Sequence, residues 1–169
     1  MTAPRKHAPP VVSIGLPVYN GEAVIARAIE SLLGQSFSEF ELIISDNAST
    51  DATADICKSY AANDNRIKYV RQPSNIGPVG NFRFVLDHSV GEYFMWVADD
   101  DVRSPDFLQE NLKILKNDPD CAFSSSPNCF EGDECDADNL QVFSLQGALY
   151  DRISAFIDNP WVSHACFYS

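Results

Sequence analysis

Apolar and polar positions recur along the N-terminal part of the chain in two patterns. A short apolar run from Val11 to Leu16 is followed by apolar side chains that recur on one helical face from Val24 to Leu33. The first pattern is typical of a buried β-strand, and the second of an amphipathic α-helix. Pro17 is expected to close the strand and Gly34 to end the helix.

The same order of strand and helix is predicted three more times along the chain. Strands are expected at Phe40–Ile44, Arg66–Arg71 and Glu92–Ala98. Turn residues and then a helical pattern follow each of them, and Pro78 stands where a proline fits the first turn of a helix. The apolar side chains expected on the inner faces of these helices are Ile56 and Tyr60, then Phe82, Val85 and Leu86, then Leu108, Leu112 and Leu115.

Four alternating units predict an α/β fold, with a doubly wound, mostly parallel, Rossmann-like sheet and helices on both faces. Residues 1–10 are polar and proline-rich, so we expect a flexible tail, whereas residues 11–118 should form the folded core. The pattern weakens in residues 119–169, where strands are expected at Cys121–Ser125 and Leu140–Leu145.

The composition describes a folded, acidic protein. Of the 169 residues, 24 are acidic and 12 are basic, which gives a formal net charge of -12, while 45% are hydrophobic. That apolar share excludes global disorder, and the scarcity of lysine and arginine argues against binding to nucleic acid or to an anionic membrane surface. No apolar run approaches the roughly 18 to 20 residues that a membrane-spanning helix needs. We therefore expect a cytoplasmic protein.

Cysteine usage agrees with that compartment. The five cysteines are odd in number, irregularly spaced and free of any C-x-x-C pair. Reduced thiols of a cytosolic protein are therefore expected. A zinc site built from ligands distant in the sequence remains a minor alternative.

Candidate chemistry gathers where the predicted strands end. In an open parallel sheet, ligands bind outside the carboxyl ends of the strands, near the point where the strand order reverses. The residues that follow or end the four strands include an aromatic ring, amides, a cation and carboxylates. They are Pro17, Tyr19 and Asn20 after the first strand, Asp46 and Asn47 after the second, Arg71 on the third, and Asp99, Asp100 and Asp101 after the fourth.

The run of three aspartates is the strongest of these signals. Adjacent carboxylates repel one another, and a hard divalent cation with oxygen ligands offsets that repulsion. Asp99, Asp100 and Asp101 therefore predict a Mg2+ or Mn2+ site with open positions for the phosphates of an anionic ligand. The alternative is a solvated turn in which Asp101 and Asp106 cap the next helix.

Tyr19 and Asp46 each have a functional and a structural interpretation. The Tyr19 ring can stack on a nucleobase, or it can simply pack half-buried with its hydroxyl in water. The Asp46 carboxylate, or the Asn47 amide beside it, can pair with the edge of that base. Alternatively, Asp46 makes an Asx-turn before the second helix.

Three stretches, Val11–Gly21, Phe40–Asp51 and Gly91–Asp101, occur in an order and spacing that resemble family 2 glycosyltransferases of the GT-A fold. The resemblance covers roughly Val11 to Leu115. It implies that residues 11–118 bind a nucleotide-diphosphate sugar and that the aspartates hold a divalent metal on the diphosphate. It further implies that the enzyme transfers the sugar with inversion.

The resemblance also implies roles on the base side of the site. Tyr19 matches the base-stacking position, Pro17 shapes the loop that holds it, and Asn20 follows within the same motif. Asp46 matches the first carboxylate of a pair whose second member is more often aspartate than the Asn47 found here. Because an amide can both donate and accept, uracil or thymine can still be read, and a UDP- or TDP-sugar is the favoured donor.

On the diphosphate side, Asp100 aligns with the metal ligand and Asp99 with the residue near the ribose. A strict D-x-D motif would instead select Asp99 and Asp101, so all three are candidates. The family commonly has an arginine where this chain has Gly80. Arg71 or Arg83 is expected to contact the diphosphate instead, the alternative for either being surface ion pairing.

The resemblance places the acceptor site and the general base in a C-terminal half, so residues 119–169 are expected to be the start of an incomplete acceptor-side region. No residue here matches that base, and the catalytic residue stays unknown. The acceptor is a saccharide, lipid or protein, and one in a membrane would be met at the inner face. Two alternatives remain: a nucleotide-sugar-binding module without transfer activity, and a phosphotransfer enzyme or receiver domain, which the residues after the first and third strands disfavour.

Overall fold

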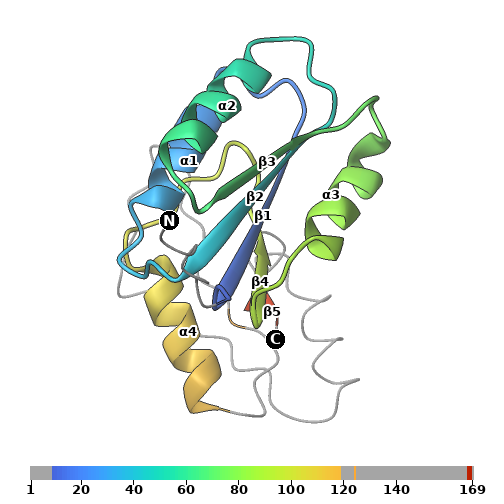
Figure 1. Cartoon of the computed structure of the whole chain (residues 1–169). Helices are drawn as coiled ribbons and strands as arrows, with labels where there is room; N and C mark the ends of the chain where they lie inside the picture. The colour runs from blue at the N-terminus through green and yellow to red at the C-terminus, as the bar shows by residue number, and fades with distance from the viewer. Residues whose placement is uncertain (1–8, 119–123, 125–166, 169) are drawn as a thin grey trace, which may run out of the picture.

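The computed structural model describes residues 9–118, 124 and 167–168, and every structural statement below concerns these residues. Within them the strands form one five-stranded sheet in the order β3-β2-β1-β4-β5 (Figure 1). The first four strands are parallel, and β5 pairs antiparallel with β4. The strands are β1 (Val12–Val18), β2 (Phe40–Asp46), β3 (Ile67–Arg71), β4 (Tyr93–Trp96) and β5 (Phe167–Tyr168).

Helices cover both faces of the sheet, as the alternating pattern predicts. Figure 1 shows α1, α2 and α4 on one side and α3 on the other. The larger hydrophobic core joins β1, β2 and β4 to α1 and α4, and a smaller core of Ile43, Val85 and Phe94 lies under α3. The helices are α1 (Ile25–Leu33), α2 (Thr53–Asn63), α3 (Gly77–Asp87) and α4 (Phe107–Asn117).

The position of β1 between β2 and β4 creates the point at which the strand order reverses. The chain runs from β1 outward to β2 and β3, then crosses the sheet through α3 to place β4 on the other side of β1. All seven residues of β1 and of β2 are buried, as expected for parallel strands covered on both faces. The carboxyl ends of β1 and β4 therefore flank the crevice in which such sheets bind ligands.

The first strand continues beyond the proline that was expected to close it. Pro17 lies inside β1, opposite Ser45 of β2, and the strand ends at Val18. Along a strand, the backbone groups of residues two apart point toward the same neighbouring strand. The carbonyl of Gly15 accepts from Val97 N, just past the end of β4, so the backbone of Pro17 also points toward that side. The missing N–H of Pro17 thus faces a position beyond the end of β4, where no ladder bond is lost.

Two further expectations on element ends change. The fourth strand is shorter than predicted, Tyr93–Trp96 instead of Glu92–Ala98. Asp106 stands at the N-cap of α4 without a side-chain capping bond, and Gln35 caps that helix instead, because its Oε1 accepts from Leu108 N (2.9 Å).

Several expectations fall on other parts of the chain. The strand expected at Leu140–Leu145 lies outside the described residues, as do most of the expected tail and all of Cys121–Ser125 except Ser124, which is not assigned to a strand. Among the described helices, none combines the length and the apolar character that crossing a membrane requires.

Candidate functional site

The described structure brings most of the predicted site residues to one edge of the sheet. Asp46 ends β2 in register with Val18 of β1 and with Arg71 of β3. Tyr19 follows β1 directly, and the loop after β1 also meets the aspartates, because a Cβ at Gly21 would collide with the Asp99 carboxylate. The ends of β1, β2, β3 and β4 thus contribute to one continuous rim.

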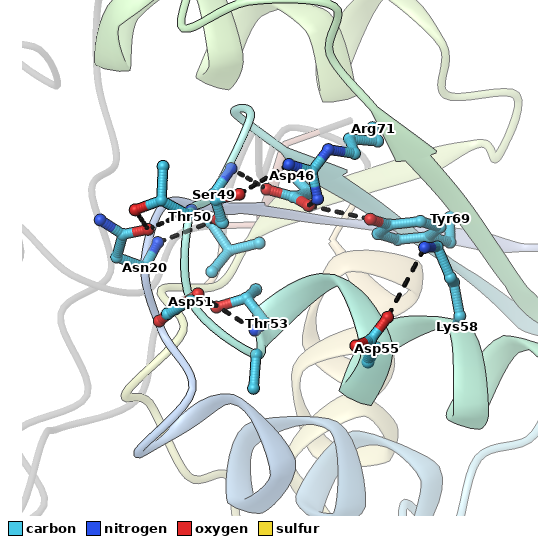
Figure 2. Close-up of polar contacts among 12 residues, drawn as sticks. Asn20, Asp46, Ser49, Thr50, Asp51, Thr53, Asp55, Lys58, Tyr69 and Arg71 are labelled. Atoms are coloured by element: carbon cyan, nitrogen blue, oxygen red, sulfur yellow. Dashed lines mark hydrogen bonds and ion pairs between the residues drawn. The ribbon is translucent and has the colours of Figure 1, made fainter.

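Asp46 is the buried centre of this rim. Its side chain is fully buried, Oδ1 accepts from Ser49 N (2.8 Å), and Oδ2 accepts from Tyr69 Oη (2.8 Å) (Figure 2). The Arg71 guanidinium lies 3.5 Å from the same Oδ2. A buried carboxylate is costly unless it is paired, and here a cation, a hydroxyl and a backbone N–H share its two oxygens. The carboxylate accepts from the N–H three residues on, so Asp46 holds the loop before α2, although not through the Asx-turn that was expected.

Burial around Asp46 also affects its neighbours. Desolvation, together with the hydrogen bond to Asp46, raises the pKa of Tyr69 well above its usual value. Burial and then the charges of Asp46 and Asp51 raise the pKa of Cys57 to about 12. Both groups therefore stay protonated at neutral pH, and Tyr69 remains a hydrogen-bond donor to Asp46.

Asn47 uses both ends of its carboxamide inside the protein. It is 3% exposed, its Oδ1 accepts from Ile76 N (2.8 Å), and its Nδ2 donates to Asn75 Oδ1 (3.0 Å) and Gly77 O (3.3 Å). These bonds hold the turn between β3 and α3 against the end of β2. In this arrangement the amide braces that turn, and its hydrogen-bonding groups do not face outward toward a base.

Tyr19 and Asn20 have different roles at the end of β1. The Tyr19 side chain is 49% exposed at the rim, which leaves a large ring face accessible for stacking. Asn20 has a left-handed backbone (φ 56°), its N–H donates to Ser49 Oγ (2.9 Å), and its Oδ1 accepts from Thr50 N (2.8 Å). Asn20, the residue after Tyr19, therefore joins the loops after β1 and β2 (Figure 2).

The three aspartates occupy three different environments. Asp99 is half-buried, and desolvation, followed by the charges of Asp100 and Asp101, raises its pKa. Asp100 is exposed. Asp101 accepts from Ala98 N (3.2 Å) and pairs with the buried Arg103 (2.8 Å), so it closes the turn. In the part of the chain that the structure describes, no three His, Cys, Asp or Glu side chains converge as a ready metal cage.

The two candidate arginines are separated. Arg71 lies at the rim, where its Nη2 donates to Ser49 O (2.7 Å) in addition to its contact with Asp46. Arg83 lies on the exposed side of α3 and pairs with Asp87 (2.7 Å). Of the two roles left open for it, the structure shows the surface ion pair.

Sequence reasoning missed Tyr69, Ser49 and Asn75 as partners of the site. Tyr69 could have been found, because it is two residues from Arg71 on β3 and side chains two apart on a strand point to the same face. Asn75 carried no such signal, since its contact with Asn47 depends on how the turn before α3 folds back.

A doubly wound sheet with an aromatic ring, amides and carboxylates at its reversal point is the architecture expected of a GT-A nucleotide-sugar-binding fold. The sequence model of "Glycosyl transferase family 2" matches residues 13–167. The chain therefore belongs to glycosyltransferase family 2. The predicted membership and fold class are both confirmed.

Among curated relatives, the chain is 37% identical over 108 residues to the "Putative glycosyltransferase EpsE" of Bacillus subtilis, which covers 63% of the chain and 39% of the relative. It is 36% identical over 93 residues to the "GalNAc(5)-diNAcBac-PP-undecaprenol beta-1,3-glucosyltransferase" of Campylobacter jejuni, covering 54% and 30%. The chain thus spans well under half the length of these relatives.

Solved structures show the same fold. S. aureus TarS, in complex with UDP-GlcNAc, superposes with a TM-score of 0.59 at 28% identity over 63% of this chain and 31% of TarS. The mannosyltransferase PcManGT from Pyrobaculum calidifontis, in complex with GDP-Man and Mn2+, has a TM-score of 0.63 at 24% identity over 73% of this chain and 37% of its own.

Proposed function

We propose that this chain forms the nucleotide-sugar-binding part of an inverting glycosyltransferase that uses a UDP- or TDP-sugar. The carrying observation is that the half-exposed Tyr19 ring and the Asp99 and Asp100 carboxylates lie along one rim, at the point where the strand order reverses. That rim can hold a base at one end and a metal-bound diphosphate at the other. The uridine donor is supported by TarS, which has been solved with UDP and with UDP-GlcNAc.

On the base side, the Tyr19 ring provides the stacking face, and the end of β2 provides the polar edge. The Asp46 carboxylate is fully buried and paired with Tyr69 and Arg71, so it acts by fixing the part-exposed Arg71 side chain at the rim, where the polar edge of a base can meet it. Pro17, fixed inside β1, sets the direction in which the chain leaves the strand toward Tyr19. A flat ring beside an oriented polar edge suits a planar base whose edge carries both donors and acceptors.

On the diphosphate side, the residues present fit a Mg2+ or Mn2+ ion held by few protein ligands. Asp101 is already paired with Arg103, so Asp99 and Asp100 are the carboxylates that would hold the ion. Magnesium-type ions commonly bind through one or two carboxylates, with substrate phosphates completing the coordination. Such an ion, when bound, offsets the negative charge that develops on the leaving diphosphate.

In the transfer step, the acceptor hydroxyl oxygen forms a bond to the anomeric carbon while the bond from that carbon to the diphosphate oxygen breaks. The hydroxyl proton passes to a general base. We assign that role to no residue of the described chain. Because one relative is named for a diphosphate-linked undecaprenol, a lipid-linked saccharide at the inner membrane face is the acceptor class to test first, consistent with a cytoplasmic enzyme.

Isothermal titration of UDP, TDP and GDP, each with and without Mn2+, tests this proposal. We expect Mn2+-dependent binding of UDP or TDP, lost in an Asp100→Ala variant. Asp55→Ala is the matched control, because Asp55 is an exposed carboxylate whose ion pair is with Lys58 on its own helix (Figure 2). Absence of nucleotide binding in every condition would contradict the proposed function.

A further inference from the structure

The loops after β1 and β2 are joined by hydrogen bonds that run in both directions. Backbone N–H groups of each loop donate to side-chain oxygens from the other side, and we call these five bonds the loop clasp. Three bonds are donated by the loop after β1: Asn20 N to Ser49 Oγ (2.9 Å), Gly21 N to Thr53 Oγ1 (2.9 Å) and Glu22 N to Asp51 Oδ2 (3.1 Å). Two bonds are donated by the loop after β2: Thr50 N to Asn20 Oδ1 (2.8 Å) and Ala52 N to Glu22 Oε2 (2.8 Å).

The loop clasp lies next to the candidate base site and reaches the aspartates. Asn20 directly follows Tyr19, and Ser49, which accepts from Asn20, also donates its N–H to Asp46 (Figure 2). Gly21 packs against Asp99 at the other end of the rim. The loop clasp therefore links Tyr19 and Asp46, proposed for the base, to Asp99, proposed for the diphosphate. The clasp bonds themselves involve none of these three side chains.

Backbone strain is concentrated in the same two loops. Asn20 and Ala48 are the described non-glycine residues with positive φ, at 56° and 60°. Left-handed backbone at non-glycine residues costs on the order of a kilocalorie and persists only where surrounding contacts enforce it. One strained residue lies in each loop, and each is within two residues of Tyr19 or Asp46.

We propose that Glu22 and Asn20 are positioning residues, which act through Tyr19 by holding its loop in the shape that binds the nucleobase. The proposal rests on the proposed function. Glu22 and Thr50 are exposed and Asp51 is partly buried, so removing one of their bonds opens no cavity in the core. A loop that is no longer held must instead be ordered when the ligand binds, and that conformational entropy is subtracted from the affinity.

Two variants of Glu22 separate this positioning role from charge. Glu22→Ala and Glu22→Gln both remove the negative charge, but only Gln keeps an acceptor for Ala52 N. We expect UDP titrated in the presence of Mn2+ to bind Glu22→Ala about fivefold more weakly than Glu22→Gln, which corresponds to one lost hydrogen bond. The midpoint of thermal unfolding without ligand should be only slightly lower in Glu22→Ala than in Glu22→Gln, because the lost bond is exposed.

Asn20→Gly is the second, independent variant, because glycine accepts the left-handed backbone and removes only the side-chain acceptor. It should show a similar loss of UDP affinity, whereas the control Asp55→Ala should bind as the unmodified chain does. Equal UDP affinity of Glu22→Ala and Glu22→Gln, or of Asn20→Gly and the unmodified chain, would overturn the positioning role alone. Failure of the unmodified chain to bind any nucleotide would overturn the proposed function, and this inference with it.

Discussion

Ala48 shows how one residue can hold a site in shape at a local cost. Its left-handed backbone (φ 60°) turns the chain so that its own N–H reaches Asp46 O (2.8 Å) and the next N–H reaches Asp46 Oδ1 (2.8 Å). A Cβ in this conformation costs roughly 1–2 kcal/mol. The turn is kept because it satisfies a buried carboxylate.

Replacing Ala48 by glycine should therefore stabilise the protein. Relief of the strain, less the added entropy of glycine in the unfolded chain, predicts a gain of about 0.5–1 kcal/mol in the free energy of unfolding. Ala62→Gly is the control: on the exposed side of α2 the same change should cost up to about 1 kcal/mol. Urea denaturation of the two variants measures both changes in the free energy of unfolding. A loss of stability in Ala48→Gly would show that the turn is unstrained.

Asn47→Asp tests whether the amide at position 47 braces the fold. The resemblance described above implies aspartate more often than asparagine at this position, so a base-reading role predicts tighter UDP binding. The structure predicts the opposite, because a carboxylate would face two acceptors, Asn75 Oδ1 and Gly77 O. We expect a loss of about 1–3 kcal/mol in the free energy of unfolding, against little change for the exposed Asn65→Asp. Unchanged stability with tighter UDP binding would favour the base-reading role.

The ionised Asp99 side chain should lower the stability of the fold while it contributes to metal binding. Because burial raises its pKa above the ordinary 3.8, the folded chain holds this proton more tightly than the unfolded chain does. Ionised Asp99 therefore destabilises the metal-free fold at neutral pH, and this effect disappears as the pH falls through the raised pKa. Asp99→Asn should raise the melting temperature at pH 7, with a gain that shrinks toward pH 4, while weakening Mn2+-dependent UDP binding. A lower melting temperature at pH 7 would contradict this account.

At the scale of elements, the sequence predicts the strands and helices well and their ends less well. The apolar period identifies β1 to β4 and α1 to α4, but not every inner-face residue, because Phe82, expected on the inner face of α3, is 42% exposed. The end of β1 was misplaced because the tolerance of Pro17 depends on where the neighbouring β4 stops, which is not a local property. Likewise the cap of α4 comes from Gln35, distant in the sequence, rather than from the adjacent Asp106.

The contact between β1 and α3 offers a test at this scale. A Cβ on Gly15 would lie 2.6 Å from Val85 Cγ2 and 2.8 Å from the Phe94 ring, both in the smaller core. Gly15→Ala should therefore push α3 from the sheet and cost about 1–3 kcal/mol. Gly80 of α3 is partly buried, but an added Cβ there meets only the exposed Ile76 side chain, at 3.3 Å, so Gly80→Ala should instead gain up to about 1 kcal/mol. Equal effects in thermal unfolding would contradict the close packing.

For the whole molecule, the sequence predicted which residues meet but not how they are used. Ligands bind at the carboxyl ends of parallel strands, which lie at one edge of the sheet, and this predicts that Tyr19, Asp46, Arg71 and Asp99 lie on one rim. It cannot say that Asn47 faces inward or that Asp101 is paired with Arg103, since those partners are set by the packing of turns. Metal ligands and base contacts therefore have to be tested one residue at a time.

The net charge of the chain leads to a last prediction. A formal charge of -12 repels a nucleoside diphosphate, and salt screens that repulsion, with a Debye length of about 10 Å at 0.1 M. Without metal, UDP should therefore bind more tightly as NaCl rises from low to moderate concentration. With saturating Mn2+, the ion at Asp99 and Asp100 offsets the local charge, and the trend should flatten or reverse.

Uridine is the matched control, because it carries the same base without phosphate charge, so its affinity should not vary with salt. Competition binding at several salt concentrations measures all three dependences, and equal trends for UDP and uridine would show that the acidic field plays no part in donor binding.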